Sequence, residues 1–297
     1  MSQAPGLGPG EILAAACRRA GLSAADAQLL SAGENHVYRL QDGAIARVSK
    51  PGQEQAAVRE VFLGSWLNAN GVRAVQPYAA LQVEQPVVVD GNPVTFWHDL
   101  GDHRPGTPRE VAAALKQLHS LPIPYKMVTQ VAPFVRLEER ITAAAWLPAD
   151  DRTWLLARLE VLQAAWTDRP RGLPDSVIHG DAWAGNVVST TEGVTFLDLE
   201  RCTIGPPEWD LASTACRVTS YSTLSAEDYA DYCEAYGRDV TQWEWFDLFR
   251  DIRELRVTCY AAYRGQHDPA LRPYAVTRVD CLRGLNGPRP WHWDPLP

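Results

Sequence analysis

Asp181, Asn186 and Asp198 are the residues whose types and spacing could do chemistry. They lie in the stretch 177–210, which reads VIHGDAWAGNVVSTTEGVTFLDLERCTIGPPEWD. Magnesium takes oxygen ligands and is usually held by one or two carboxylates together with substrate phosphates. A carboxylate beside such an ion can orient and deprotonate a hydroxyl group. The stretch therefore indicates a metal site made by Asn186 and Asp198, with Asp181 as the candidate base.

A hairpin must position these side chains. Two apolar runs, residues 187–188 and 194–197, flank a Thr-Thr-Glu-Gly turn, which predicts two antiparallel strands. The second strand would deliver Asp198 and then Glu200, and strand alternation would place both on the same side. Glu200 could then assist the metal through a water molecule. The alternative is that the Asp and Asn side chains only cap a turn, as these residue types often do.

The spacing from Asp181 to Asn186 equals the Asp-to-Asn spacing of H-R-D-x-x-x-x-N in protein kinases. Gly180 replaces the Arg, and Asp-Leu-Glu at 198–200 stands where protein kinases have D-F-G. Together, H-G-D-x-x-x-x-N, D-x-E and G-P-P-E-W-D-L resemble the aminoglycoside phosphotransferase family, the small-molecule branch of the kinase fold. The resemblance implies that Asp210 hydrogen-bonds the backbone of the catalytic loop.

The same resemblance implies an α+β, protein-kinase-like fold of two lobes. Residues 1–96 would form the nucleotide-binding lobe, an antiparallel sheet with one main helix. Residues 97–101 would form the hinge, where backbone groups around His98 and Leu100 hold the adenine. Residues 102–297 would form a mostly helical lobe that carries the catalytic hairpin and binds the acceptor.

A loop of small residues, 31–36, precedes the strand expected at 37–40. An Asp-Gly pair follows, which is a strong hairpin signal, and the returning strand covers 44–48. The resemblance implies that backbone groups of this loop, which includes Gly33 and Asn35, contact the nucleotide phosphates. With its single glycine, the loop alone reads as an ordinary turn.

Arg47 in the returning strand stands where protein kinases have the lysine that contacts the α- and β-phosphates. Its planar fork and fixed charge suit phosphate, although Arg and Lys are not equivalent. A helix is predicted over 54–68, and Glu60 on it would position Arg47. The inward stripe of this helix is expected to be Val58, Val61, Phe62 and Ser65. The alternatives are a surface arginine and an exposed glutamate.

In the second lobe, a helix is predicted to begin after Thr107, which would be its N-cap. Pro108 would be its first residue and Glu110 its third. Two further helices are predicted within 134–168. A helix over 225–236 has an acidic face with no Lys or Arg in it, made by Glu227, Asp228, Asp231 and Glu234. This face is a candidate wall for a cationic acceptor, and an ordinary solvated face is the alternative. Core packing accounts for the eleven tryptophans without a cofactor.

The composition is that of an ordinary globular protein, with 46% hydrophobic and 22% charged residues in 297. The net charge of -8 argues against nucleic acid or an anionic membrane surface as a partner. No window is apolar enough for a transmembrane helix. The six cysteines are scattered without a C-x-x-C pair, which favours reduced thiols in a cytoplasmic protein.

These features predict a phosphotransferase that uses ATP or GTP with Mg²⁺ and phosphorylates a hydroxyl of a small molecule. A cationic antibiotic, an aminoglycoside or a similar compound, is the first choice of acceptor, which would give a role in resistance. A metabolite kinase acting on choline, homoserine or a sugar is the alternative. A catalytically inactive nucleotide-binding module is the third possibility, supported by Arg47 and the weak glycine loop.

Overall fold

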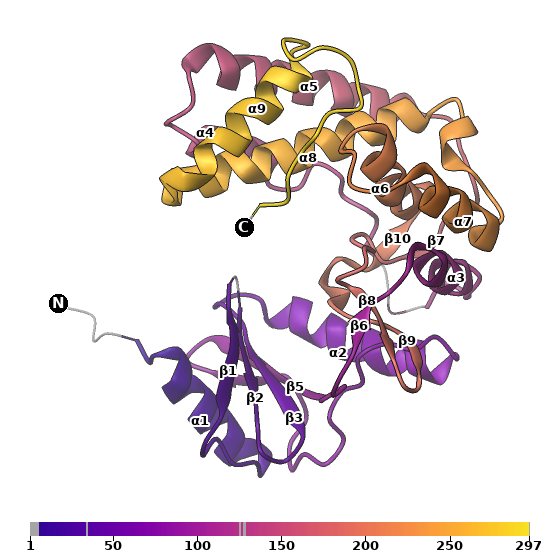
Figure 1. The fold of residues 1–297 in the computed structure, drawn as a ribbon. Coiled ribbons are helices and arrows are strands. Elements are labelled where there is room, and N and C mark those ends of the chain that lie inside the picture. The colour runs from indigo at the N-terminus through magenta and orange to yellow at the C-terminus, as the bar shows by residue number, and fades with distance from the viewer. Residues whose placement is uncertain (1–5, 34, 125, 127–128, 297) are drawn as a thin grey trace. The chain divides into compact units, whose positions relative to one another are not determined.

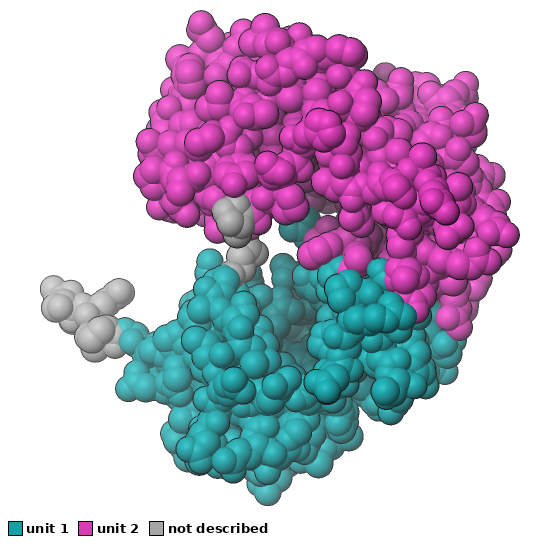
Figure 2. All heavy atoms as spheres, in the orientation of Figure 1, with its two compact units in different colours: residues 1–106, 185–201 teal, residues 107–184, 202–297 magenta. Residues whose placement is uncertain are grey.

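The computed structural model describes residues 6–33, 35–124, 126 and 129–296. The chain divides into two compact units, shown in teal and magenta in Figure 2. Unit 1 contains residues 1–106 and 185–201, and unit 2 contains residues 107–184 and 202–297. The catalytic hairpin, which the sequence analysis placed with the second lobe, thus groups with the N-terminal unit. The functional boundaries of the two lobes and the hinge stay predictions.

The main sheet of unit 1 is antiparallel throughout, with the strand order β1-β2-β3-β5-β4 (Figure 1). Its strands are β1 (Gln28–Ala32), β2 (His36–Arg39), β3 (Ala44–Val48), β4 (Val87–Val89) and β5 (Asn92–His98). The hairpin predicted around the Asp-Gly pair is present as β2 and β3. Glu34, in the predicted phosphate loop, lies outside the described residues.

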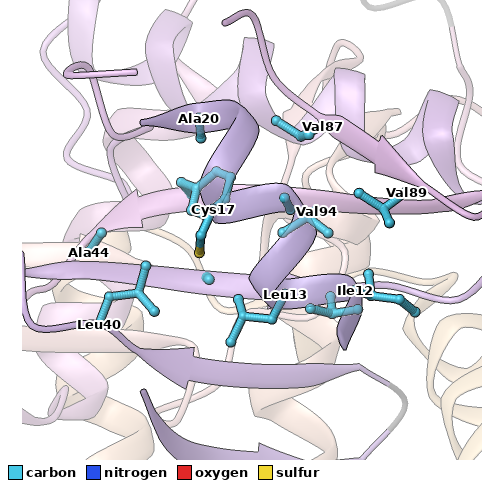
Figure 3. Packing of buried hydrophobic residues seen from close by; sticks show 13 residues of the cluster. Ile12, Leu13, Cys17, Ala20, Leu40, Ala44, Val87, Val89 and Val94 are labelled. Atoms are coloured by element: carbon cyan, nitrogen blue, oxygen red, sulfur yellow. The ribbon is translucent and has the colours of Figure 1, made fainter. Parts of the chain in front are cut away.

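Helices α1 (Pro9–Ala20) and α2 (Glu54–Ala69) cover opposite faces of this sheet, as the alternation along β3 requires. Ala44, Ala46 and Val48 are buried in the cluster with α1, which Figure 3 shows from close by. The residues between them face the other way, and Arg47 there meets Glu60 of α2. The sheet therefore presents an apolar face to α1 and a face that carries Arg47 to α2.

The expected inward stripe of α2 is wrong. Val58 is 51% exposed, and Ser65 is exposed as well. The buried residues of the helix are Ala57, Glu60, Leu63, Gly64 and Leu67. A Cβ on Gly64 would lie 2.7 Å from the Val75 carbonyl oxygen, so the missing side chain lets the helix approach closely. Leu63 and Leu67, which the expected stripe left out, face inward together with the small residues Ala57 and Gly64, which carry little hydrophobic signal.

The catalytic hairpin belongs to a second, small sheet of unit 1, in the order β6-β8-β9. Its strands are β6 (Arg104–Pro105), β8 (Val187–Thr190) and β9 (Gly193–Phe196), and the turn η1 (Leu199–Arg201) follows. Phe196 at the end of β9 also accepts a backbone hydrogen bond from Val75. The hairpin is therefore attached to the segment that follows α2.

Unit 2 is mostly helical, with one pair of short strands. Its elements are α3 (Pro108–His119), α4 (Leu137–Ala143), α5 (Ala149–Asp168), β7 (Ser176–Ile178), β10 (Thr203–Gly205), α6 (Glu208–Thr219), α7 (Ala226–Tyr236), η2 (Val240–Gln242), α8 (Phe246–His267), η3 (Pro269–Leu271) and α9 (Arg272–Leu282). Helix α3 begins with the predicted capping box between Thr107 and Glu110.

Helix α8 is the centre of unit 2, because α4, α5, α6 and α9 all pack against it (Figure 1). Gly265 lets the turn between α4 and α5 pack on α8, since a Cβ there would lie 2.8 Å from the Trp146 ring. After α9 the chain returns to α6, where Trp291 donates a backbone hydrogen bond to Ser220. Among the helices that the structure describes, none has a stretch long and apolar enough to cross a membrane.

Candidate functional site

The loop that carries Asp181 follows β7 directly, in unit 2. Gly180 has a φ of 82°, a left-handed conformation that glycine adopts without the steric cost of a side chain. This explains why a glycine precedes Asp181 where protein kinases have an arginine. Asp181 itself is half-buried, and its N–H points to His179 Nδ1 at 3.3 Å.

Asp210 at the start of α6 is hydrogen-bonded to the backbone of this loop. Its carboxylate accepts hydrogen bonds from the backbone N–H of His179 at 2.7 Å and of Gly180 at 2.8 Å. Asp210 is fully buried, so these bonds are shielded from water. The bracing role that the resemblance implied is thus seen in the hydrogen bonds. It fixes the backbone immediately before the candidate base.

Two residues that the sequence analysis gave no role complete this support. His119, at the end of α3, lies 3.1 Å from Asp210 Oδ2 through Nε2 and 2.9 Å from the Tyr236 hydroxyl through Nδ1. Arg253 of α8 donates to the Trp209 carbonyl at 2.6 Å and to the Gly180 carbonyl at 3.4 Å. Burial alone would raise the pKa of Asp210, but His119, His179 and Arg253 together lower it. Asp210 therefore stays ionised and accepts strongly.

Asn186 and Asp198 lie at the open end of the hairpin in unit 1. The register pairs Val187 with Phe196, so Asn186 and Leu197 face each other, and the Leu197 N–H donates to the Asn186 carbonyl at 2.8 Å. Asp198 comes one residue later with a φ of 49°, and it is exposed. The predicted hairpin is present and brings Asn186 and Asp198 to one end, whereas their role as metal ligands stays a prediction.

The expectation that Asp198 and Glu200 share one side of a strand is wrong. Strand β9 ends at Phe196, before either residue, and Glu200 lies in η1. The left-handed conformation at Asp198, which Asp tolerates better than most residues, turns the chain out of the strand. Glu200 consequently contacts Arg47 at 2.7 Å, whereas Asp198 faces solvent.

Arg47 is the most heavily bonded side chain of this part of unit 1. Its NH1 donates to Glu60 Oε1 and its NH2 to Glu200 Oε2, both at 2.7 Å. With its oxygen turned toward the guanidinium, the Asn35 amide accepts from Nε at 2.9 Å and from NH2 at 2.6 Å. The predicted pair of Arg47 and Glu60 is present, and neither residue is a surface charge. Glu200 and Asn35 are partners that the sequence analysis did not give it.

The other predicted nucleotide-binding residues have ordinary surroundings. A Cβ on Gly33 would meet only Ser31 Oγ, at 4.0 Å, so neighbouring atoms do not require glycine there. His98 is exposed at the end of β5 and packs on Tyr78, with 4.8 Å between ring centroids. The His98 N–H already donates to the Gln76 carbonyl, so it is not available to an adenine. Leu100 is half-buried. The adenine contacts of the hinge stay a prediction.

The cluster around Arg47 carries excess negative charge. Burial raises the pKa of Glu60 to about 7, Arg47 opposes this, and Asp198 and Glu200 add to it. The three carboxylates together raise the pKa of Arg47, although burial alone would lower it. Among the described residues, no three His, Cys, Asp or Glu side chains gather into a complete metal site. A partial set of oxygen ligands in a negatively charged cluster nevertheless fits a divalent cation that takes its remaining ligands from a substrate.

The acidic face of α7 is exposed but partly balanced by neighbours. Glu234 pairs with Arg109 of α3 at 2.7 Å, a cation that lies outside the helix sequence. Asp228 exchanges hydrogen bonds with Ser225 and so belongs to the helix cap. Glu227 and Asp231 complete the face, and both are exposed. The arrangement supports the solvated-face alternative more than a dedicated acidic wall.

Trp183 departs from the expectation that the tryptophans are core residues. It lies two positions after Asp181 in the catalytic loop and is 52% exposed. Sequence reasoning missed it because it treated all tryptophans alike. A signal was available, since Trp183 stands in a loop motif of small residues outside any periodic pattern.

Known proteins resemble this chain in sequence family and in fold. A sequence model of the phosphotransferase enzyme family matches residues 26–249. No curated protein is found to match the sequence. Solved structures do match. A choline kinase from Streptococcus pneumoniae has a TM-score of 0.63 at 15% identity, covering 88% of this chain and 93% of that one. An aminoglycoside phosphotransferase from Streptomyces rimosus has a TM-score of 0.60 at 18% identity, covering 82% and 96%.

A third similar structure is an amicoumacin kinase solved with AMP-PNP and Ca²⁺. Its TM-score is 0.63 at 14% identity, and the match covers 87% of this chain and 89% of that one. At such identities the likeness shows a shared fold. It confirms the predicted protein-kinase-like α+β fold class.

Proposed function

Because the chain belongs to the phosphotransferase enzyme family, we propose that it transfers the γ-phosphate of ATP or GTP to a hydroxyl of a small molecule. One observation carries this proposal. The backbone on both sides of the His179–Gly180 bond is fixed by the buried carboxylate of Asp210, and Asp181 follows at once. Phosphoryl transfer depends mainly on positioning and charge neutralisation, so a rigidly held carboxylate suits it.

Each candidate residue has a separate task in this proposal. Asp181 accepts the proton of the acceptor hydroxyl and orients that hydroxyl toward the phosphate. Asn186 and Asp198 would hold Mg²⁺, which would neutralise charge on the phosphates when bound. Arg47, kept in place by Glu60, would contact the phosphates of the nucleotide. The hinge near His98 and Leu100, and the loop with Gly33 and Asn35, would hold the rest of the nucleotide.

The acceptor is proposed to be a cationic antibiotic, as the aminoglycoside phosphotransferase among the similar structures suggests. The acidic face of α7 adds little to this choice, because Glu234 pairs with Arg109 and only Glu227 and Asp231 are exposed acids without a role in the helix cap or that pair. The choline kinase among the similar structures supports the alternative of a metabolite kinase. Both reactions consume a nucleoside triphosphate, and we place the enzyme in the cytoplasm, where that substrate is available.

A coupled assay of nucleoside diphosphate release tests the proposal. Purified protein would be screened with ATP and with GTP, with and without Mg²⁺, against aminoglycosides, other cationic antibiotics, choline, homoserine and sugars. The expected result is Mg²⁺-dependent turnover that requires one acceptor class and yields a phosphorylated product of the added mass. Nucleotide binding without turnover for any acceptor would support an inactive binding module instead.

Ionic strength separates a cationic acceptor from a neutral one. If exposed acids attract a polycation, kcat/KM should fall steeply between 0.1 M and 1 M salt, because the Debye length shrinks from about 10 Å to about 3 Å. Replacing Glu227 and Asp231 by the corresponding amides should weaken that dependence and leave the nucleotide KM unchanged. An unchanged salt dependence in this variant would show that α7 does not bind the acceptor.

A further inference from the structure

All three nitrogens of the Arg47 guanidinium have a partner within unit 1, and these contacts use four of its five N–H groups. NH1 meets Glu60, NH2 meets Glu200, and the Asn35 amide oxygen faces Nε and NH2. A phosphate that binds an edge of this guanidinium through two N–H groups must therefore displace a partner of NH2, because both such edges include NH2. A lysine ammonium presents its three N–H donors from one point, whereas the planar guanidinium presents separate edges that different acceptors can hold. Because this chain has an arginine here, a bound phosphate would compete with Glu60, Glu200 or Asn35 for the guanidinium.

The ion pairs of Arg47 with Glu60 and with Glu200 differ in strength. The Glu60 side chain is 5% exposed and belongs to a long helix, whereas the Glu200 side chain is 37% exposed and belongs to a single turn. A buried carboxylate that loses its partner is left without solvent, which is costly. A partly exposed carboxylate can be hydrated instead, so its ion pair is the weaker one. Glu200 is therefore the partner that a phosphate displaces more easily.

The backbone of η1 is attached to α2 independently of the Glu200 side chain. Arg59 of α2 donates to the Glu200 carbonyl oxygen at 3.3 Å, and η1 packs against α2. An exchange therefore requires only a rotation of the Glu200 side chain. Asp198 stands two residues away, so the released carboxylate adds to the negative charge beside the candidate metal ligand.

We propose that Glu200 is an exchangeable partner of Arg47, which occupies NH2 of the guanidinium in the nucleotide-free protein and yields it to the nucleotide phosphates. Glu60 stays bound to NH1 and keeps the fork oriented. Glu200 is thus a positioning residue that competes with the phosphates for the arginine. This inference rests on the proposed binding of a nucleotide by Arg47, and it adds to that proposal the competition between Glu200 and phosphate.

The competition has a consequence that a merely structural role of Glu200 would not have. Glu200→Gln removes the competing charge, so metal-free nucleotide should bind more tightly than it binds to the wild type. The gain should be about fivefold, the usual scale for a partly exposed ion pair. With Mg²⁺ present the gain should shrink or reverse, because a carboxylate released beside Asp198 then favours the cation. Glu60→Gln should weaken binding under both conditions, because the guanidinium loses its fixed partner.

Isothermal titration calorimetry measures the dissociation constant of ADP for each variant, once in EDTA and once in Mg²⁺. Glu192→Gln is the matched control, because Glu192 is an exposed acid in the turn between β8 and β9 that pairs with Arg73, away from Arg47. It changes the net charge equally and should leave both constants unchanged. In an Arg47→Ala background, Glu200→Gln should give no gain, because the guanidinium through which it acts is absent.

Three results would overturn the inference. Unchanged or weaker metal-free binding in Glu200→Gln would show that Glu200 does not compete. The same gain in Glu192→Gln, or in the Arg47→Ala background, would show a general charge effect. If the wild type itself binds no nucleotide under either condition, the proposed function fails before the competition is reached.

Discussion

Asp210→Asn should uncouple the catalytic loop from α6. In the wild type, the two carboxylate oxygens accept from the His179 and Gly180 N–H groups, and one of them also lies 3.1 Å from His119. An amide has only one oxygen, so its NH₂ end must face one of the two buried N–H donors. An unsatisfied buried donor costs about 1–3 kcal/mol, and losing the charge on the other bond costs about 1 kcal/mol more. The variant should therefore lose about 3 kcal/mol of unfolding free energy.

Urea denaturation gives the stability, and steady-state kinetics with the acceptor found in the screen give the activity. We expect kcat to fall by about tenfold or more, because the backbone before Asp181 is no longer fixed. Glu208→Gln is the matched control. Glu208 is equally buried on the same helix, but it accepts from Leu173 and does not touch the loop. It should destabilise the protein with little change in kcat.

The pH dependence gives a second measure of the same variant. The pKa of Asp210 is lower in the folded protein than in the unfolded chain, where it is about 3.9. The ionised carboxylate therefore adds to the free energy of unfolding above about pH 3.9, and this stabilisation is lost as the pH falls through the pKa of the folded protein. The difference in stability between wild type and Asp210→Asn should therefore be constant at neutral pH and narrow below about pH 4. Equal urea midpoints at pH 7 would refute the assignment of Asp210 as the brace of the loop.

Three further predictions concern the other candidate residues. Asp198→Ala should abolish the strengthening of nucleotide binding by Mg²⁺, and a calorimetric affinity equal to that of the wild type in Mg²⁺ would contradict the metal assignment. Since the folded pKa of Glu60 is raised to about 7, its contribution to stability is full below the unfolded pKa and is lost as pH rises through 7. The wild type should thus lose on the order of 3 kcal/mol more than Glu60→Gln between pH 4 and pH 8 in urea denaturation, and parallel curves would refute this. Trp183→Ala should raise the acceptor KM and leave the nucleotide KM alone, and unchanged kinetics would place Trp183 outside the acceptor site.

Local signals in the sequence predicted much of this fold. The capping box of Thr107 and Glu110 located the start of α3, and the Asp-Gly turn located the hairpin of β2 and β3. Such signals are reliable because they depend on a few residues whose backbone preferences are strong. The spacing from Asp181 to Asn186 likewise located the catalytic loop and the start of the hairpin. The bonds from Asp210 to the backbone of this loop followed only from the family resemblance, and its contact with His119 was not predicted.

The errors come from features that the sequence encodes weakly. The buried side of α2 is lined by Ala57 and Gly64, whose small size permits close packing but adds little to a hydrophobic pattern. The left-handed conformation of Asp198 ended the strand early, and nothing in the local sequence distinguishes it from a strand residue. The long-range bonds of Arg47 to Glu200 and of Arg253 to Gly180 join segments far apart in the chain. Spacing alone cannot reveal such pairs.

The rate of phosphoryl transfer by Asp181→Ala tests the central claim most directly. The acceptor is the one that supports turnover by the wild type, and product is followed by nucleoside diphosphate release at saturating magnesium nucleotide. If Asp181 is the positioned base, kcat should fall by roughly 10² to 10⁴ while the nucleotide affinity changes little. A variant that keeps more than about a tenth of the wild-type kcat would show that Asp181 is not the base, and that the resemblance to the kinase loop does not extend to its chemistry.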